Sequence, residues 1–206
     1  MRFGLTANIY GFVFTKLLKD YCKNNYPNTD FNPVKRAIMK EYKAMIERTP
    51  GIGGNINESN LIGACFFFSM AKANPNLTPL LLDEIIDYIM RSNFMKKVYN
   101  GKKKKGTVFS EKVQNKKIVE AKKSHNSIYK MDWEFTYEKK EDEFYCTYTK
   151  CGVCKLAAIE HVEEFLPCMC KMDYAKFELL GAELIRTKTL SNGDECCNFH
   201  VIKNEK

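Results

Sequence analysis

Side chains that can do chemistry are concentrated in the last third of the chain. Six of the nine cysteines among the 206 residues lie there, namely Cys151, Cys154, Cys168, Cys170, Cys196 and Cys197. An aspartate, an arginine and two threonines accompany them. A thiolate can attack an electron-poor carbon or bind a soft metal, and a guanidinium can hold a small anion. The sequence therefore predicts that the functional site lies in this third of the chain.

Several of these cysteines are predicted to lie where a helix begins. Cys151 opens an expected helix over residues 151–161, where free backbone N–H groups and the helix dipole favour a thiolate. Cys168 and Cys170 lie at the start of a second expected helix over residues 167–180, so the same argument applies to them. The cysteines outside this region are interpreted as small hydrophobic residues of the core: Cys22, Cys65 and Cys146.

The same thiols could instead bind a metal ion. Cys151 and Cys154 form a CxxC pair, and Cys168 and Cys170 form a CxC pair. A zinc ribbon, however, takes its ligands from two CxxC knuckles at hairpin tips, whereas these thiols are expected at helix starts. We therefore expect neither a metal nor another cofactor, and keep these four cysteines as the alternative ligand set.

Two polar residues near the thiols have a functional and a structural interpretation. Asp173 falls in the first turns of the second expected helix, where it could stabilise the helix dipole or transfer a proton. Arg186 falls on an expected strand over residues 182–189. If it faces the helices, its buried guanidinium needs an anionic partner, which could be Asp173 or a substrate carboxylate. Thr189 is expected on the opposite face of that strand.

The elements that must position these residues change type along the chain. Apolar residues at helical spacing predict four N-terminal helices: one over residues 9–22, one that begins at Asn32-Pro33 with the asparagine as cap, one over residues 61–72, and one opened by Thr78-Pro79. From Trp133 the period is that of a strand. A hairpin is expected over residues 133–149, and further strands over residues 182–189 and 196–202.

These elements predict an α+β fold. A helical N-terminal half should be followed by a C-terminal antiparallel sheet of about four strands with two helices on one face. Residues 1–100 are assigned to the helical region, 101–130 to a lysine-rich connection, and 131–206 to the cysteine-rich domain. We expect the cysteine-rich domain to form one compact unit with the helices.

Charge and hydropathy narrow the range of partners. The net charge of +8 comes mainly from residues 96–130, and Lys102–Lys105 are interpreted as an exposed, mobile part of the connection because no aromatic residue interleaves them. The longest uncharged apolar run, residues 61–71, is too short to cross a bilayer. Since no signal peptide is recognised either, we expect a cytoplasmic protein that binds neither nucleic acid nor membrane. Its oligomeric state is left open.

One run of residues resembles a known family. The pattern Cys151, Cys170-x-x-Asp173, Gly181, Arg186-x-x-Thr189, Gly193-Asp194-x-x-Cys197-x-Phe199 is similar to the C-terminal signature of the L-2-amino-thiazoline-4-carboxylic acid hydrolase family. The resemblance covers about residues 133–202. Its last strands are also similar to 4-vinyl reductase type small-molecule-binding domains, which are α+β sandwiches with an internal ligand pocket.

The resemblance implies a hydrolase that opens a small cyclic amidine or thiazoline, such as 2-amino-thiazoline-4-carboxylate, to an N-carbamoyl-cysteine-type product. It implies catalytic roles for Cys151, Cys170 and Asp173, and substrate binding by Arg186, Thr189 and Cys197. Cys154, Cys168 and Cys196 are not part of the pattern.

Two mechanisms are compatible with such an enzyme. In one, a thiolate of Cys170 or Cys151 attacks the ring carbon, with Asp173 as the proton-transfer group and Arg186 as the carboxylate clamp. In the other, water attacks directly and the cysteines are structural. The alternative outside enzymes is a non-catalytic module that binds a small molecule or a metal.

Overall fold

The computed structural model describes the backbone of residues 1–104 and 108–204, and the side chains of these residues except 102–104. The elements are α1 Leu5–Asn25, α2 Phe31–Arg48, α3 Glu58–Ala73, α4 Pro79–Arg91, α5 Asn93–Lys104, α6 Glu111–Ser124, β1 Glu134–Lys139, β2 Glu143–Lys150, α7 Gly152–Glu160, α8 Leu166–Leu179, β3 Ala182–Ile185 and β4 Cys197–Lys203. Short 3-10 turns lie at Glu163–Phe165 and Leu190–Asn192. The predicted exposure and mobility of Lys102–Lys105 fall outside the described side chains.

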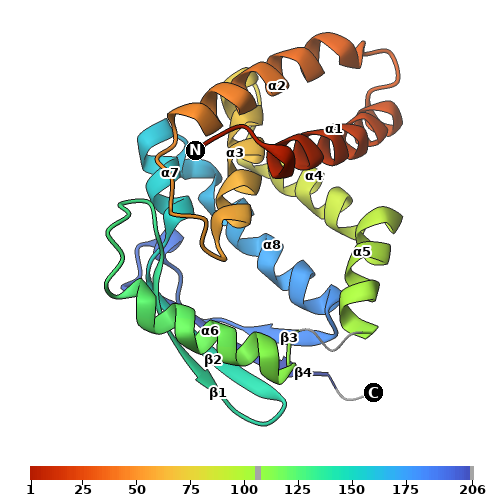
Figure 1. The fold of residues 1–206 in the computed structure, drawn as a ribbon. Helices are drawn as coiled ribbons and strands as arrows, with labels where there is room; N and C mark the ends of the chain where they lie inside the picture. Colours follow the sequence, from red (N-terminus) through yellow and green to blue (C-terminus); the bar gives the residue numbers. More distant parts are fainter. Residues whose placement is uncertain (105–107, 205–206) are drawn as a thin grey trace.

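The predicted α+β architecture is confirmed. The C-terminal strands form an antiparallel sheet in the order β1-β2-β4-β3, and α1 to α5 build the helical N-terminal half (Figure 1). One face of the sheet carries three buried side chains, those of Phe135 on β1, Phe144 on β2 and Val201 on β4. Helix α8 packs on this face beside β3, and α6 runs along β1.

The core runs from the sheet into the N-terminal half through α3. Ten consecutive residues of this helix, Leu61 to Met70, are buried. A helix that is apolar on every side must be enclosed by others, and α3 packs against α1, α2 and α7. Helix α4 packs on α8. Residues 33–95 contain no strand, as the predicted helical N-terminal half requires.

Two helix starts in the N-terminal half can be compared with their sequence signals. Thr78 caps α4 as predicted, because its side-chain hydroxyl accepts a hydrogen bond from the N–H of Leu81 at 3.2 Å. The predicted cap at Asn32 is wrong. Asp30 caps α2 instead, since its carboxylate accepts from the N–H of Asn32 at 2.9 Å, and Pro33 then lies inside the first turn.

The lysine-rich stretch assigned to a connection contains more helix than its weak periodicity indicates. Helix α5 extends into it, and α6 follows Ser110. Helix α6 is held to the sheet by polar contacts. The amide of Gln114, which is 1% exposed, accepts a hydrogen bond from the Tyr137 hydroxyl at 2.8 Å, and the Ser124 hydroxyl bonds the backbone of Phe135.

Ion pairs join the helical half to the last third of the chain. Arg48 at the end of α2 bonds both carboxylate oxygens of Glu160 at the end of α7, at 2.7 and 2.5 Å. Lys171 on α8 bonds Asp83 on α4 at 2.6 Å. No helix of the described residues is long and apolar enough to cross a membrane.

Candidate functional site

Cys151 lies at the junction between β2 and α7. It is the residue before the first helical one, with extended backbone angles of φ −127° and ψ 123°. The next residue, Gly152, lies where there is no room for a side chain. A Cβ added there would lie 2.4 Å from the carbonyl oxygen of Met131 and 2.7 Å from the ring of Trp133. The start of α7 is therefore pressed against the segment that leads into β1.

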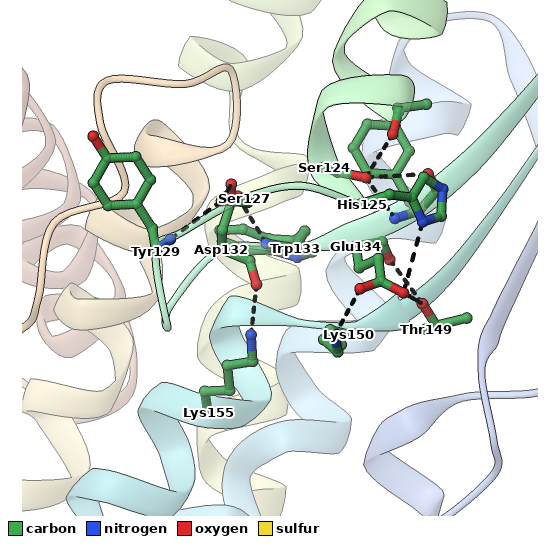
Figure 2. A network of polar contacts seen from close by, with 12 residues as sticks. Ser124, His125, Ser127, Tyr129, Asp132, Trp133, Glu134, Thr149, Lys150 and Lys155 are labelled. Atoms are coloured by element: carbon green, nitrogen blue, oxygen red, sulfur yellow. Dashed lines mark hydrogen bonds and ion pairs between the residues drawn. The ribbon is translucent and has the colours of Figure 1, made fainter.

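A polar network fixes this segment (Figure 2). The Asp132 carboxylate accepts hydrogen bonds from the Asn55 amide at 2.6 Å, the Ser127 hydroxyl at 2.6 Å and the N–H of Trp133 at 2.8 Å. Lys155 on α7 donates to the carbonyl oxygen of Asp132 at 2.6 Å. One buried aspartate thus ties together the loop after α2, the start of β1 and the first turn of α7.

Cys151 and Cys154 lie one helical turn apart at this junction, and the two thiols shift each other's pKa. The Cys154 thiol and the backbone N–H groups of Cys154 and Val153 lower the pKa of Cys151, although burial opposes them. The interaction with Cys151, together with burial, raises the pKa of Cys154. Cys151 is therefore the thiol of the pair that ionises first, and Cys154 is its proton-bearing neighbour.

Cys170 has a different environment on α8. Its half-buried thiol donates to the Ser191 hydroxyl at 3.3 Å. Burial raises the pKa of Cys170, and this outweighs the Ser191 hydrogen bond and the charge of Arg186, which act in the other direction. The predicted thiolate character at a helix start thus holds for Cys151 but not for Cys170, which lies inside α8 rather than before it.

Arg186 faces the helices and is almost entirely enclosed. Its side chain is 3% exposed, and its guanidinium lies over the rings of Tyr174 and Phe199 at 4.9 and 5.0 Å. One terminal nitrogen donates to the carbonyl oxygen of Cys170 at 2.8 Å, and the other lies 3.4 Å from the Asp173 carboxylate. The buried Nε has no hydrogen-bond partner. Asp173 is thus the anionic partner that a buried arginine requires.

The predicted strand over residues 182–189 is too long. Strand β3 ends at Ile185. Beyond it, the side-chain amide oxygen of Asn198 on β4 accepts hydrogen bonds from the backbone N–H groups of Thr187 at 3.0 Å and Lys188 at 2.7 Å, in place of strand pairing. Thr189 consequently lies in a loop and not on a strand face. Its N–H donates to the Asp194 carboxylate at 2.7 Å.

That loop brings Thr189 and Cys197 to the same neighbourhood as Cys170. The Ser191 hydroxyl, which accepts from Cys170, donates to the Thr189 hydroxyl at 3.2 Å. The Cys197 sulfur accepts from the N–H of Leu190 at 3.2 Å, and burial raises the pKa of Cys197 to about 11.

Mutual effects on pKa indicate which of the predicted residues the fold brings together. Cys151 acts to raise the pKa of Cys170 and Cys197, and Cys170 and Cys197 act to raise the pKa of Cys154. The Asp173 carboxylate acts to raise the pKa of Cys151 and of Cys170. We call the four thiols Cys151, Cys154, Cys170 and Cys197 the thiol cluster. Arg186 and Asp173 lie beside it.

Cys168 does not belong to the thiol cluster. It is buried on the side of α8 that faces α4, and its thiol donates to the carbonyl oxygen of Pro79 at 3.2 Å. Residues two apart on a helix point about 200° apart, so Cys168 and Cys170 cannot face one ion. No group of three or more His, Cys, Asp or Glu side chains within residues 1–104 and 108–204 is arranged to hold a metal. The alternative ligand set is therefore not assembled.

Tyr148 and Cys146 lie beside the thiol cluster, although the sequence indicated no role for Tyr148 and only a core position for Cys146. Burial raises the pKa of the Tyr148 phenol, and Cys146, Asp173 and Cys151 raise it further. Alternation along β2 could have found both, because they share a sheet face with Phe144. Burial raises the pKa of Cys146 to about 12, in keeping with its interpretation as a core residue.

Two of the cavities in the described part of the chain lie away from the thiol cluster. One, of about 380 Å³, lies between the loop after α2 and the segment before β1, and Asn55, Ser127 and Asp132 are among its lining residues. The other, of about 970 Å³, lies between α1 and α4, with Phe12 and Phe94 at its sides. None of the predicted site residues lines either cavity.

Comparison with known proteins assigns a family. Neither the curated proteins nor the solved structures gave a match. The family model described as L-2-amino-thiazoline-4-carboxylic acid hydrolase matches residues 63–201. The match includes α3 from Gly63 onward, strands β1 to β3, β4 up to Val201 and every residue of the thiol cluster, and it supports a hydrolase-type function in general. The chain belongs to the L-2-amino-thiazoline-4-carboxylic acid hydrolase family.

Proposed function

We propose that the protein opens a small cyclic amidine or thiazoline ring, such as 2-amino-thiazoline-4-carboxylate, to an N-carbamoyl-cysteine-type product. Family membership supports the hydrolase class. The observation that carries the assignment is the environment of Cys151, the thiol whose pKa is lowered by the backbone N–H groups of α7 and by the Cys154 thiol. A thiolate held in this way is an activated nucleophile.

In the first step, the Cys151 thiolate attacks the ring carbon between sulfur and nitrogen. This carbon is electrophilic because it bears two nitrogens and one sulfur. The bond between it and the ring sulfur then breaks, and the sulfur leaves as a thiolate that takes up a proton. The carbon stays bound to Cys151 as an isothiourea, and the rest of the substrate now carries a free thiol.

In the second step, water attacks the same carbon and the Cys151 thiolate leaves. We assign Asp173 as the group that takes the proton from the water. Its carboxylate is 30% exposed, so water has access to it, and it acts electrostatically on Cys151. The water oxygen becomes the carbonyl oxygen of the N-carbamoyl group, so one water is consumed in each turnover.

We assign the remaining residues to binding and positioning. Arg186 holds the backbone of Cys170 and the carboxylate of Asp173 together, and its unpartnered Nε is the donor left for a substrate carboxylate. Tyr174 covers the guanidinium but is itself 42% exposed, so its ring has room to turn aside.

Thr189, Cys197 and Cys170 complete the proposed substrate side of the site. The first two are assigned to substrate binding, next to Ser191. Cys170 remains the second candidate for the nucleophile. We favour Cys151 because burial raises the pKa of Cys170 and leaves it protonated at neutral pH.

The test is release of a new thiol from 2-amino-thiazoline-4-carboxylate. It is followed with a chromogenic disulfide after blank correction for the nine cysteines of the protein, and the product is identified by mass spectrometry. We expect one thiol and one N-carbamoyl-cysteine for each substrate consumed. If a panel of thiazolines and cyclic amidines releases no thiol and yet raises the melting temperature, the protein is a binding module and not this enzyme.

A further inference from the structure

The CxxC turn at the start of α7 has a property that hydrolysis does not use. Cys154 is outside the family pattern, yet it completes a CxxC turn with Cys151 at the start of α7 and lowers the pKa of Cys151. The two residues are one helical turn apart, because the N–H of Lys155 already bonds the carbonyl oxygen of Cys151 at 3.2 Å. Side chains three apart at a helix start lie on one face, with Cβ atoms about 5–6 Å apart. A disulfide needs Cβ atoms about 3.5–4.5 Å apart, so the bond forms when the turn tightens slightly and the two sulfur atoms rotate toward each other.

The other thiols of the cluster have different partners. The Cys170 sulfur donates to Ser191, and the Cys197 sulfur accepts from the N–H of Leu190. Cys154 lies one helical turn after Cys151, and its thiol has the largest effect on the pKa of Cys151. The neighbour best placed to reach an oxidised Cys151 sulfur is therefore Cys154.

The turn is anchored to the segment before β1, so the pair is held close together. Gly152 fits against Met131 without room for a Cβ, and Lys155 is tied to the backbone of Asp132 (Figure 2). The Lys155 ammonium also acts electrostatically on Cys151, and a nearby cation favours its thiolate. Cys151 and Cys154 are half-buried residues, whereas Cys168 and Cys146 are buried.

We propose that Cys151 and Cys154 are a site of reversible oxidation by low-molecular-weight disulfides. The Cys151 thiolate attacks one sulfur of the small disulfide, forms a mixed disulfide and expels the other half as a thiolate. Cys154 then gives up its proton to that thiolate and attacks the Cys151 sulfur, expelling the second half. Two electrons pass to the small disulfide, which becomes two thiols, while the protein loses two hydrogens. Loss of hydrolysis on oxidation rests on the proposed role of Cys151, whereas formation of the disulfide does not.

The experiment equilibrates the reduced full-length protein with mixtures of reduced and oxidised glutathione. Free thiols are blocked after an acid quench, disulfides are then reduced and labelled with a second reagent, and the labelled peptides are identified by mass spectrometry. We expect Cys151 and Cys154 to acquire the second label together, at the least oxidising mixture that modifies any of the nine cysteines. The intact mass should fall by two hydrogens.

Two variants sharpen the test. Cys154→Ser removes the resolving thiol, so Cys151 should stop at a stable glutathione adduct, which appears as a mass increase on that residue. Cys22→Ser, a half-buried thiol on α1, is the matched control and should leave the pair unchanged.

The outcomes decide for or against the pair. First oxidation at another pair, such as Cys196 and Cys197, or no adduct on Cys151 in folded Cys154→Ser, overturns the proposal. If Cys154→Ser does not fold, mapping of the wild-type protein still decides. A pair that oxidises as expected in a protein without thiazoline hydrolysis would reject the proposed function and leave this site intact.

Discussion

Replacing Arg48 tests whether the two halves of the chain fold as one unit, which we propose from the ion pair between α2 and α7. The Glu160 carboxylate is 5% exposed and is bonded by Arg48 at 2.7 and 2.5 Å. Arg48→Met leaves this carboxylate enclosed without its cation. Loss of one partner of a fully buried pair costs about 3–5 kcal/mol. Because Arg48 is itself 40% exposed, we expect a smaller loss, ~2–3 kcal/mol of unfolding free energy.

A matched ion pair on the same helix provides the control. Lys43 and Glu47 are 60% and 53% exposed and 3.9 Å apart, so Lys43→Met should cost less than about 0.5 kcal/mol. Glu160→Gln leaves the partly exposed Arg48 with its second partner, Glu41 at 2.5 Å, and should cost less than Arg48→Met, about 1 kcal/mol. The three values should therefore rank Arg48→Met, Glu160→Gln, Lys43→Met.

Urea unfolding with two probes measures these values and the cooperativity together. Far-ultraviolet circular dichroism reports mainly the N-terminal helices, and fluorescence of Trp133, the single tryptophan, reports the start of the sheet. One folding unit gives coincident transitions in the wild type. Equal losses for Arg48→Met and Lys43→Met, or well-separated transitions, would refute the reasoning.

Three further predictions concern the site. Gly152→Ala should lower the unfolding free energy by about 2–4 kcal/mol in urea titrations, because its Cβ would lie 2.4 Å from the Met131 carbonyl oxygen; a neutral effect would contradict that packing. Arg186→Gln should mainly raise the substrate concentration needed for half-maximal rate, since a carboxylate clamp contributes to ground and transition states alike, and an unchanged KM would remove this role. A chelator should leave the circular dichroism and melting temperature unchanged, whereas elemental analysis with about one zinc per chain, lost together with the fold, would restore the metal alternative.

The fold was predictable wherever one periodicity extended over a whole element. The apolar run in α3 and the alternation from Trp133 onward each correspond to one kind of packing, a buried helix and a half-buried sheet. The predicted strand beyond Ile185 was wrong because one side chain, Asn198, bonds backbone groups that would otherwise pair with β4. Alternation of residue types does not report such a contact.

The site was predictable in its residue types and less so in its chemistry. Cys151 and Cys170 received the same expectation, but only Cys151 lies before its helix, where the first backbone N–H groups help to lower its pKa. Helix geometry alone predicts that Cys168 and Cys170 face different sides of α8, because residues two apart point about 200° apart. The pairing of Arg186 with Asp173 and the cover by Tyr174 depend on contacts between separate elements, which no spacing in the sequence defines.

The pH dependence of the reaction gives a further test of the nucleophile. If the thiolate of Cys151 is the reactive form, kcat/KM rises with pH as this thiol ionises. Its lowered pKa places that rise below the value of about 8.5 for a free cysteine. Cys154→Ser still offers a hydroxyl to Cys151, so the rise should shift by less than in Cys154→Ala. A rise that stays near the free-cysteine value in the wild type would contradict the assignment.

The central claim is that Cys151 forms a covalent bond to the ring carbon, and acid-quenched intact mass measures this most directly. With 2-amino-thiazoline-4-carboxylate in excess, the wild-type protein should gain the mass of one substrate molecule, and peptide mapping should locate the gain on Cys151. Cys151→Ser should show no gain and should release thiol at least ~10²-fold more slowly. A wild-type protein that turns over without any adduct, or a folded Cys151→Ser that keeps its rate, would contradict the account and favour direct attack by water.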